Sequence, residues 1–380
     1  MSEYQYYEFQ AVDRPLTAKE MAELRSFSTR ARITPTTFVN DYSWGNFKGD
    51  EDAWMEKYFD AFLYIANWGT RVLKLALPSS VLDAKTARRF CAGEQATVRD
   101  CSGKVILTFV TEDDEGGDWI DGEGWLSSFV SARAELARGD LRALYLAWLL
   151  CAQHGEVDDG ELEPPIPRGL AHLDASLEGL IEFLRIDKDL VAAAATASGP
   201  LVDHEAEADG IRQWLATLPG AAKDDVLARL MAGETSLASE LVQRMRREGG
   251  GDDGAGRGAA KRRTAGELLR DAQDLAAERR RAEAETAAKE KARRERAAAV
   301  ARARHLNLLS GREPTLWSQV NELIATRQPK SYEEAVQLLV DLRDLSRRND
   351  GIDFHVRLEA LRAEQARKPS LIHRLDRAGL

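Results

Sequence analysis

The sequence predicts a multidomain, mainly α-helical protein, on the basis of three observations. Short runs of aromatic and β-branched residues, typical of strands, occupy roughly the first 110 residues. Beyond them, apolar residues recur every third or fourth position, as they do in amphipathic helices. A glycine-rich stretch and a long run of Ala, Arg, Glu and Lys then divide the remainder of the chain.

These observations define five segments, and 380 residues are enough for two or three domains of roughly 100 to 200 residues each. We expect a small α/β (α+β) domain at 1–124, a helical bundle at 125–247, a flexible linker at 248–263, a long charged and solvated helix at 264–310, and a C-terminal helical module at 311–380.

The composition is that of a globular protein with a large charged surface, with 44% hydrophobic and 31% charged residues. No run of about 18 apolar residues occurs, and the first ten residues lack the pattern of a secretory signal. We therefore expect a cytoplasmic protein without a membrane partner. The three cysteines lack CxxC spacing, which predicts reduced thiols rather than a disulfide framework or a structural zinc site.

Charge is distributed unevenly along the chain. The net charge of -10 is the sum of -17 over residues 1–260 and +7 over residues 261–380. Such asymmetry favours an anionic partner for the C-terminal part, or docking of one part on the other.

Local signals predict the elements of the first segment. Thr17 and Glu20 form a capping box that opens a helix, and Cys101-Ser102-Gly103 predicts a hairpin turn. Pro35 favours an edge position for the extended stretch around it. Further strands are expected in YQYYEFQAV, FLYIANW and RVLKLALP, and a further helix in DEDAWMEKYFD.

Residues 125–247 show helical periodicity. GDLRALYLAWLL, residues 139–150, predicts a strongly amphipathic helix with Asp140 as its N-cap. PPIP, residues 164–167, interrupts the pattern, and several short helices follow. No fixed repeat period occurs, so we expect a compact bundle of helical hairpins.

GGGDDGAGRGAA, residues 249–260, has the composition of a flexible linker. The glycines at 254 and 256 faintly resemble a nucleotide-binding loop, but no strand precedes them and no P-loop lysine follows.

The stretch RRRAEAETAAKEKARRERAAAVARAR, residues 279–304, has ten basic and four acidic residues and no aromatic one. Large apolar residues are missing from it apart from Val300, which disfavours a coiled-coil seam. Its arginines point in different directions around a helix, whereas a nucleic-acid groove binder would gather them on one stripe. The favoured interpretation is a solvated spacer helix supported by i,i+4 pairs such as Glu285 with Lys289. Nonspecific contact with phosphates remains an alternative.

Candidate contact residues follow from these interpretations. If the stretch binds nucleic acid, within the wider range 261–310, its exposed arginines would make the contacts. Two tryptophans of the acidic loop could anchor a protein partner, although packing onto the sheet is the favoured alternative for them. The candidates for partner or nucleic-acid contact are Arg293, Arg294, Arg296, Arg302, Arg304, Trp119 and Trp125.

The last segment predicts helices opening at Glu313-Pro314 and at Ser331, which is followed by Glu334, and a third helix near the end. The stretches YEEAVQLLVDLRDL and RLEALRAEQARKPSLIHRLDRAGL resemble the C-terminal ends of large bacterial proteins with a SWIM-type zinc finger. The finger's CxC and CxH ligands are absent from this chain, so only a helical tail suited to partner binding is implied. YQYYEFQAVDRPL similarly resembles the opening of bacterial proteins of unknown function.

Common catalytic motifs, including HExxH, GxSxG and GxxxxGK[ST], do not occur in the chain. The acidic loop 111–125 does not match the ligand spacing of an EF-hand. His154, Glu156, Asp158 and Asp159 form a dense His and carboxylate group, but a single loop does not define a metal site. The sequence therefore predicts neither a catalytic residue nor a cofactor or metal ligand.

Two classes of function remain open. The favoured one is a noncatalytic bacterial adaptor or scaffold that binds protein partners through helical modules, within a complex that could include nucleic acid. The alternatives are an enzyme of unrecognised type with a site in the N-terminal half, around Trp119, Asp121 and His154, or a nonspecific nucleic-acid-binding protein that uses the basic helix.

Overall fold

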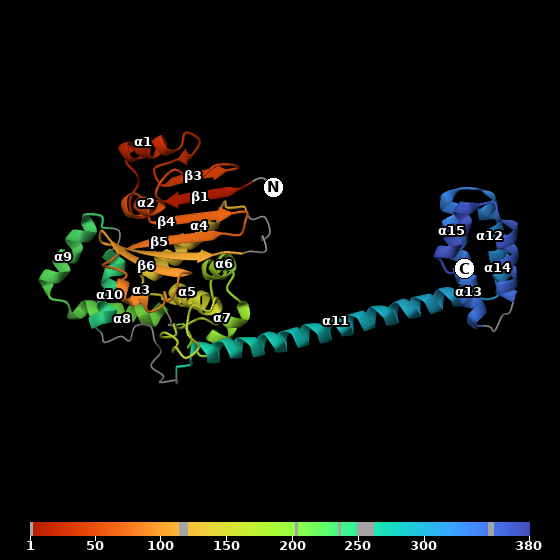
Figure 1. Cartoon of the computed structure of the whole chain (residues 1–380). Helices are drawn as coiled ribbons and strands as arrows, with labels where there is room; N and C mark the ends of the chain where they lie inside the picture. Colours follow the sequence, from red (N-terminus) through yellow and green to blue (C-terminus); the bar gives the residue numbers. More distant parts are fainter. Residues whose placement is uncertain (1–2, 114–120, 202–203, 235–236, 249–261, 349–352) are drawn as a thin grey trace. The chain divides into compact units, whose positions relative to one another are not determined.

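The computed structural model describes residues 3–113, 121–201, 204–234, 237–248, 262–348 and 353–380. Residue contacts divide the chain into two compact units, unit 1 (Met1–Arg279) and unit 2 (Arg280–Leu380). Within the described residues there are fifteen helices and one seven-stranded sheet (Figure 1). The protein is therefore mainly α-helical, with its sheet in the N-terminal region.

The sheet belongs to unit 1 and is antiparallel throughout, with strand order β2-β3-β1-β4-β5-β7-β6. The predicted strands FLYIANW and RVLKLALP correspond to β4 and β5, which pair directly. Ser102 and Gly103 form the two-residue turn between β6 and β7, with positive φ at both positions. That turn type twists with the sheet and favours glycine. The strands are β1 (Gln5–Gln10), β2 (Arg32–Ile33), β3 (Thr37–Tyr42), β4 (Ala61–Ala66), β5 (Arg71–Pro78), β6 (Ala96–Cys101) and β7 (Lys104–Thr111).

Several of the helices of unit 1 pack on this sheet. The Thr17–Glu20 capping box is confirmed at the start of the first of them. Their bounds are α1 (Ala18–Phe27), α2 (Glu51–Lys57), α3 (Ala84–Arg88), α4 (Trp125–Ala137), α5 (Arg142–Gln153), α6 (Ala175–Leu184), α7 (Lys188–Ala195), α8 (His204–Thr217), α9 (Gly220–Met231) and α10 (Leu237–Glu248), followed by the first turns of α11 (Ala265–Leu309).

Each face of the sheet buries a separate apolar core, because alternate residues of a strand point to opposite faces. On one face, side chains such as Leu73 and Leu107 pack with helices α4 to α7. On the other face, Phe9, Phe62 and Trp54 form an aromatic core under α1 and α2.

The predicted boundary between residues 124 and 125 does not separate two domains. The sheet and helices α4 to α7 share one core and lie in one unit, so the strands would lose a buried face without the helices. Hydrophobic periodicity changes at that point because the secondary structure changes, while the domain continues.

Helix α5 also differs from its prediction. Every residue from Arg142 to Ala152 is buried, so the helix lies inside unit 1 rather than presenting a polar face to solvent. Its N-cap position is Leu141, and the Asp140 carboxylate instead accepts hydrogen bonds from the backbone and side chain of Arg142. An apolar stripe of i,i+3 and i,i+4 residues indicates a helix, but it does not show how many sides of the helix are covered.

Unit 2 contains the rest of α11 and four further helices around one apolar core. The predicted opening at Glu313-Pro314 is correct, with Pro314 in the first turn. The predicted cap at Ser331 is wrong, because the helix already begins at Pro329. The helices are α12 (Glu313–Ala325), α13 (Pro329–Arg348), α14 (Asp353–Glu364) and α15 (Pro369–Arg377).

Candidate interaction surfaces

Helix α11 lies within one residue of the limits predicted for the long helix. Thr264 and Glu267 form a capping box at its start, in which each accepts a hydrogen bond from the other's backbone N–H. Ala265 and Leu268 are fully buried in the core of unit 1, and Ala272 is nearly so. The first turns of the helix are therefore part of unit 1, and not of a separate segment after the linker.

A buried charged cluster fixes the chain just before α11. The Arg263 guanidinium lies 2.6 Å from one carboxylate oxygen of Glu163, whose other oxygen accepts a hydrogen bond of 2.5 Å from the Tyr145 hydroxyl. Glu163 is fully buried, and burial together with this carboxylate raises the pKa of Tyr145 far above its ordinary value. The predicted linker therefore ends in a fixed contact at Arg263, whereas residues 249–261 lie outside the described residues.

The other end of α11 is fixed within unit 2. Arg302 forms ion pairs with Asp341 and, at 2.7 Å, with Asp344, and His305 Nε2 lies 2.9 Å from the second carboxylate oxygen of Asp341. Asp341 is only 2% exposed, and Leu306 is buried in the same core. Burial alone would raise the pKa of Asp344, but the hydrogen bond from Arg302 lowers it below its ordinary value.

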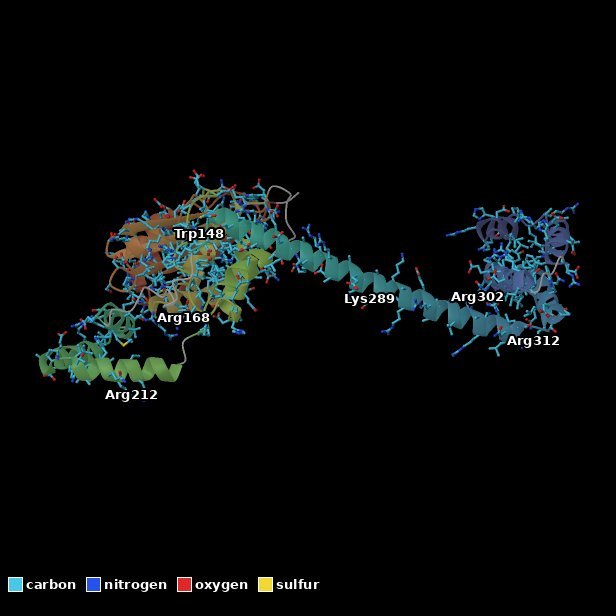
Figure 2. The ribbon with its side chains drawn as sticks, turned by 90° about the horizontal axis from the view of Figure 1, so that it is seen from below. Trp148, Arg168, Arg212, Lys289, Arg302 and Arg312 are labelled. Atoms are coloured by element: carbon cyan, nitrogen blue, oxygen red, sulfur yellow. The ribbon has the colours of Figure 1, made fainter. Side chains whose placement is uncertain are left out.

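Between these two anchors the helix is solvated, as predicted. Every residue from 278 to 301 is exposed. Figure 2 shows side chains standing out from the ribbon around Lys289, which forms a 2.6 Å ion pair with Glu285 one turn earlier. At the start of this stretch Arg279 still forms a 2.8 Å ion pair with Asp189 of α7. Local pairs such as Glu285 with Lys289 support the exposed helix beyond it.

The candidate arginines divide into two groups. Arg293, Arg294 and Arg296 belong to the exposed stretch, and Arg304 is exposed as well. Arg302 differs from them, because its guanidinium is engaged by the two aspartates of α13. The structure thus gives Arg302 an intramolecular role that the local sequence did not reveal.

The two candidate tryptophans also differ. Trp119 lies outside the described residues. Trp125 begins α4 and is half-buried, with its ring 6.1 Å from Phe129 and 5.7 Å from Phe183, measured between centroids. Its ring contacts are with helices α4 and α6, whereas the favoured alternative was packing onto the sheet.

Asp121 and the loop of His154 and Glu156, which were considered for catalysis together with the undescribed Trp119, lie in different places. Glu156 accepts hydrogen bonds from the backbone N–H groups of Glu94 and Gln95, just before β6. Asp121 lies near Tyr4, just before β1. Four strand spacings, about 19 Å, separate β1 from β6. Among the described residues, no three His, Cys, Asp or Glu side chains are grouped closely enough to hold a metal ion.

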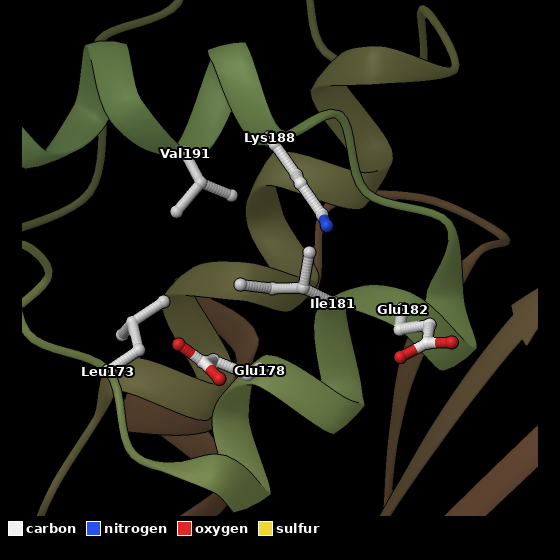
Figure 3. Close-up of a pocket in the computed structure, with 6 residues that line it drawn as sticks. All are labelled: Leu173, Glu178, Ile181, Glu182, Lys188 and Val191. Atoms are coloured by element: carbon white, nitrogen blue, oxygen red, sulfur yellow. The ribbon is translucent and has the colours of Figure 1, made fainter.

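A small open groove lies between α6 and α7 in unit 1 (Figure 3). Its volume is about 340 Å³, and Ile181 lies at its centre. Glu178 and Lys188 reach toward it from the two helices. Two carboxylates and one ammonium group line it beside aliphatic side chains. The lining residues are Leu173, Glu178, Ile181, Glu182, Lys188 and Val191.

Two exposed apolar features were not predicted from the sequence. Helix α9 has no buried residue, and Leu227, Leu230 and Met231 are 57%, 60% and 88% exposed. Their i, i+3, i+4 spacing predicts a core face, so nothing in the local pattern distinguishes them from buried leucines. The other feature is the pair Trp44 and Trp68, each next to a glycine in a turn. The adjoining glycine is a turn signal that could have suggested exposure.

Comparisons with known proteins give no assignment for these surfaces. A scan against protein-family models, a search of curated proteins and a search of solved structures found no match. Across the described part of the chain, the helices are all too short or too polar to cross a membrane.

Proposed function

We propose that the protein is a noncatalytic adaptor that binds protein partners through its helical modules. The observation that carries this proposal is the environment of α11. Its first turns are buried in unit 1 and its last turn in unit 2, while the 24 residues from 278 to 301 are all exposed. A helix that contributes to two cores at its ends and is exposed between them is suited to joining two binding modules.

The exposed ridge of α9 supports a protein partner. Leu227, Leu230 and Met231 lie on one side of the helix and leave a contiguous apolar surface in water, which is unfavourable unless a partner covers it. Helical ridges with i, i+3, i+4 anchors are a common means of protein recognition.

Affinity purification with the full chain tests the adaptor. A triple variant, Leu227→Ser, Leu230→Ser and Met231→Ser, should retain the fold because these side chains are exposed, but it should lose the captured protein partners. A control with Asp224→Ser and Asp225→Ser changes exposed residues of the same helix and should retain them. Equal recovery of every protein by both variants would contradict a role for α9.

Nucleic-acid binding by α11 is the second candidate, supported by nine basic and four acidic residues between 280 and 304. Filter binding at two salt concentrations separates it from the adaptor. A phosphate-binding helix requires affinity that falls steeply with salt, with a log-log slope near -0.9 per duplex phosphate contacted. That affinity should vanish when 280–301 is replaced by a helix of alternating Glu and Lys, whereas the partners of an adaptor should remain bound.

A further inference from the structure

Two tryptophans are exposed near the end of the sheet where β1 begins. Trp44 is 69% and Trp68 is 45% exposed, although a side chain of this size is usually largely buried. The last residues of β3 and β4, Tyr42 and Ala66, both pair with Gln5, the first residue of β1. Each tryptophan therefore follows a strand end by two residues, and the two strand ends lie about 10 Å apart, on either side of β1.

The backbones that carry these rings are held in place. The side chain of Gln5, itself 3% exposed, donates hydrogen bonds to the Gly45 carbonyl at 2.9 Å and to Asn46 Oδ1 at 3.2 Å, beside Trp44. In the turn of Trp68, the Gly69 carbonyl accepts a 2.9 Å hydrogen bond from Arg185. A partner would meet two anchored turns, so binding would require little ordering of the backbone.

Carboxylates surround the same end of the sheet. Asp41, Asp121 and Glu123 are exposed, and Glu123 also forms a 3.7 Å ion pair with the exposed Arg32. Asp41 lies opposite Tyr6 in the register of β3 with β1, and Asp121 and Glu123 flank Gly122. Gly122 lies against the ring of Tyr6, where a Cβ atom would come within 2.2 Å of a ring carbon. The chain between Asp121 and Glu123 is thereby fixed at this surface.

One interaction within the chain shows what these rings can bind. The guanidinium carbon of Arg30 lies 5.2 Å from the centroid of the Trp44 ring. A tryptophan face attracts a cation, and the planar guanidinium of arginine both stacks on the ring and pairs with carboxylates in a bidentate manner. The overall charge favours the same ligand, because unit 1 contains 48 acidic and 32 basic residues.

We propose that the surface formed by Trp44, Trp68, Asp41, Asp121 and Glu123 binds an arginine-rich segment of a partner protein. The surface is separate from the α9 ridge and from α11, so this inference goes beyond the adaptor proposal and can fail independently of it.

Calorimetric titration of the full chain with a synthetic peptide of alternating Arg and Gly tests the proposal. The peptide should bind more tightly than the matched peptide of Lys and Gly, because lysine lacks the planar group. Trp44→Ala and Trp68→Ala should each weaken binding about two- to fivefold, the effect of losing one exposed cation–π contact. Arg30→Ala, which frees the Trp44 ring and removes a positive charge, should tighten it.

A charge-matched pair of variants serves as the control. Asp121→Asn with Glu123→Gln should weaken binding of the arginine peptide, whereas Asp224→Asn with Asp225→Asn on α9 removes the same charge and should have a smaller effect. Equal losses from the two pairs would show nonspecific attraction to an acidic protein and would overturn the proposal. So would tryptophan variants that bind the peptide as tightly as the unaltered chain.

Discussion

Helix α5 and the middle of α11 are both regular helices, but they exist in opposite environments. In α5 every residue from Arg142 to Ala152 is buried, and large apolar residues occupy all sides. In α11 every residue from 278 to 301 is exposed, and Ala, Arg, Glu and Lys predominate. The first helix is stabilised by what it packs against, and the second by intrinsic helix propensity and local ion pairs.

This difference predicts how far the effect of a substitution extends. A change in α5 should lower the stability of the whole of unit 1, because the helix shares a core with the sheet. A change between residues 278 and 301 should affect the helix locally and leave both cores intact. The two ends of α11 should behave like α5, because they are buried.

The largest effect is expected for Trp148→Ala in α5. Trp148 is 1% exposed and packs beside Tyr145, with ring centroids 5.9 Å apart. Removing the indole leaves a cavity in a close-packed core, so the free energy of unfolding of unit 1 should fall by about 3–5 kcal/mol. Urea denaturation monitored by circular dichroism measures this change in the free energy of unfolding. Trp44→Ala, which removes an exposed indole, is the control and should shift the midpoint little.

A somewhat smaller effect is expected for Asp341→Asn, which tests whether the last turns of α11 behave as part of a core. The substitution leaves the Arg302 guanidinium and the His305 imidazole without their shared carboxylate. Because Asp341 is 2% exposed, we expect unit 2 to lose about 3 kcal/mol of stability. Asp376→Asn, which removes a more exposed partner of Arg362, provides the comparison and should cost less than about 1 kcal/mol. A similar loss of stability from both variants would contradict the assignment of the last turns of α11 to the core of unit 2.

The contrast between the two helices also explains what the sequence could predict. The limits of α11 and the turn at Ser102-Gly103 follow from local rules: helix propensity with a capping box in one case, and turn geometry in the other. The burial of α5 on all sides does not follow from local rules, because it depends on which elements cover the helix. The shared core on either side of residue 124 is missed for the same reason.

The interaction surfaces were less predictable still. The role of Arg302 depends on Asp341, 39 residues later in the chain. The strand ends that precede Trp44 and Trp68 lie on either side of β1 only because β1 pairs with both β3 and β4. The exposure of Leu227 and Leu230 on α9 is a tertiary property, since the same spacing would serve a buried helix equally well.

Acid should lower the stability of unit 1, by about 2 kcal/mol, but not that of the solvated helix. Burial would raise the pKa of Asp60, but Lys104 at 2.9 Å and the backbone N–H groups of Val12 and Asp13 lower it below its ordinary value. A carboxyl group with a lowered pKa in the folded state stabilises the protein above its unfolded pKa, near 3.9, and loses this contribution as the pH falls through the folded value.

We therefore expect the stability of unit 1 to fall below about pH 4, and Asp60→Asn to lower it by about 2 kcal/mol at neutral pH. The difference between the two proteins should shrink as the pH is lowered toward 2. Urea titrations at several pH values check this. A difference that is independent of pH would show that the charge of Asp60 is not what stabilises the fold.

The smallest effect provides the sharpest comparison, because the same substitution can be made in both helices. Ala292→Gly in the exposed part of α11 should cost about 1 kcal/mol of local helix stability, the usual difference between glycine and alanine in a helix interior. Hydrogen exchange should show faster exchange around residue 292, while the urea midpoints of both units stay unchanged. Ala147→Gly in α5 has the same backbone cost and also removes a methyl group from a fully buried site, so it should lower the unfolding free energy of all of unit 1. If Ala292→Gly shifted the unfolding of either unit by as much as Ala147→Gly shifts that of unit 1, the middle of α11 would have to make tertiary contacts, and its role as a solvated spacer would be wrong.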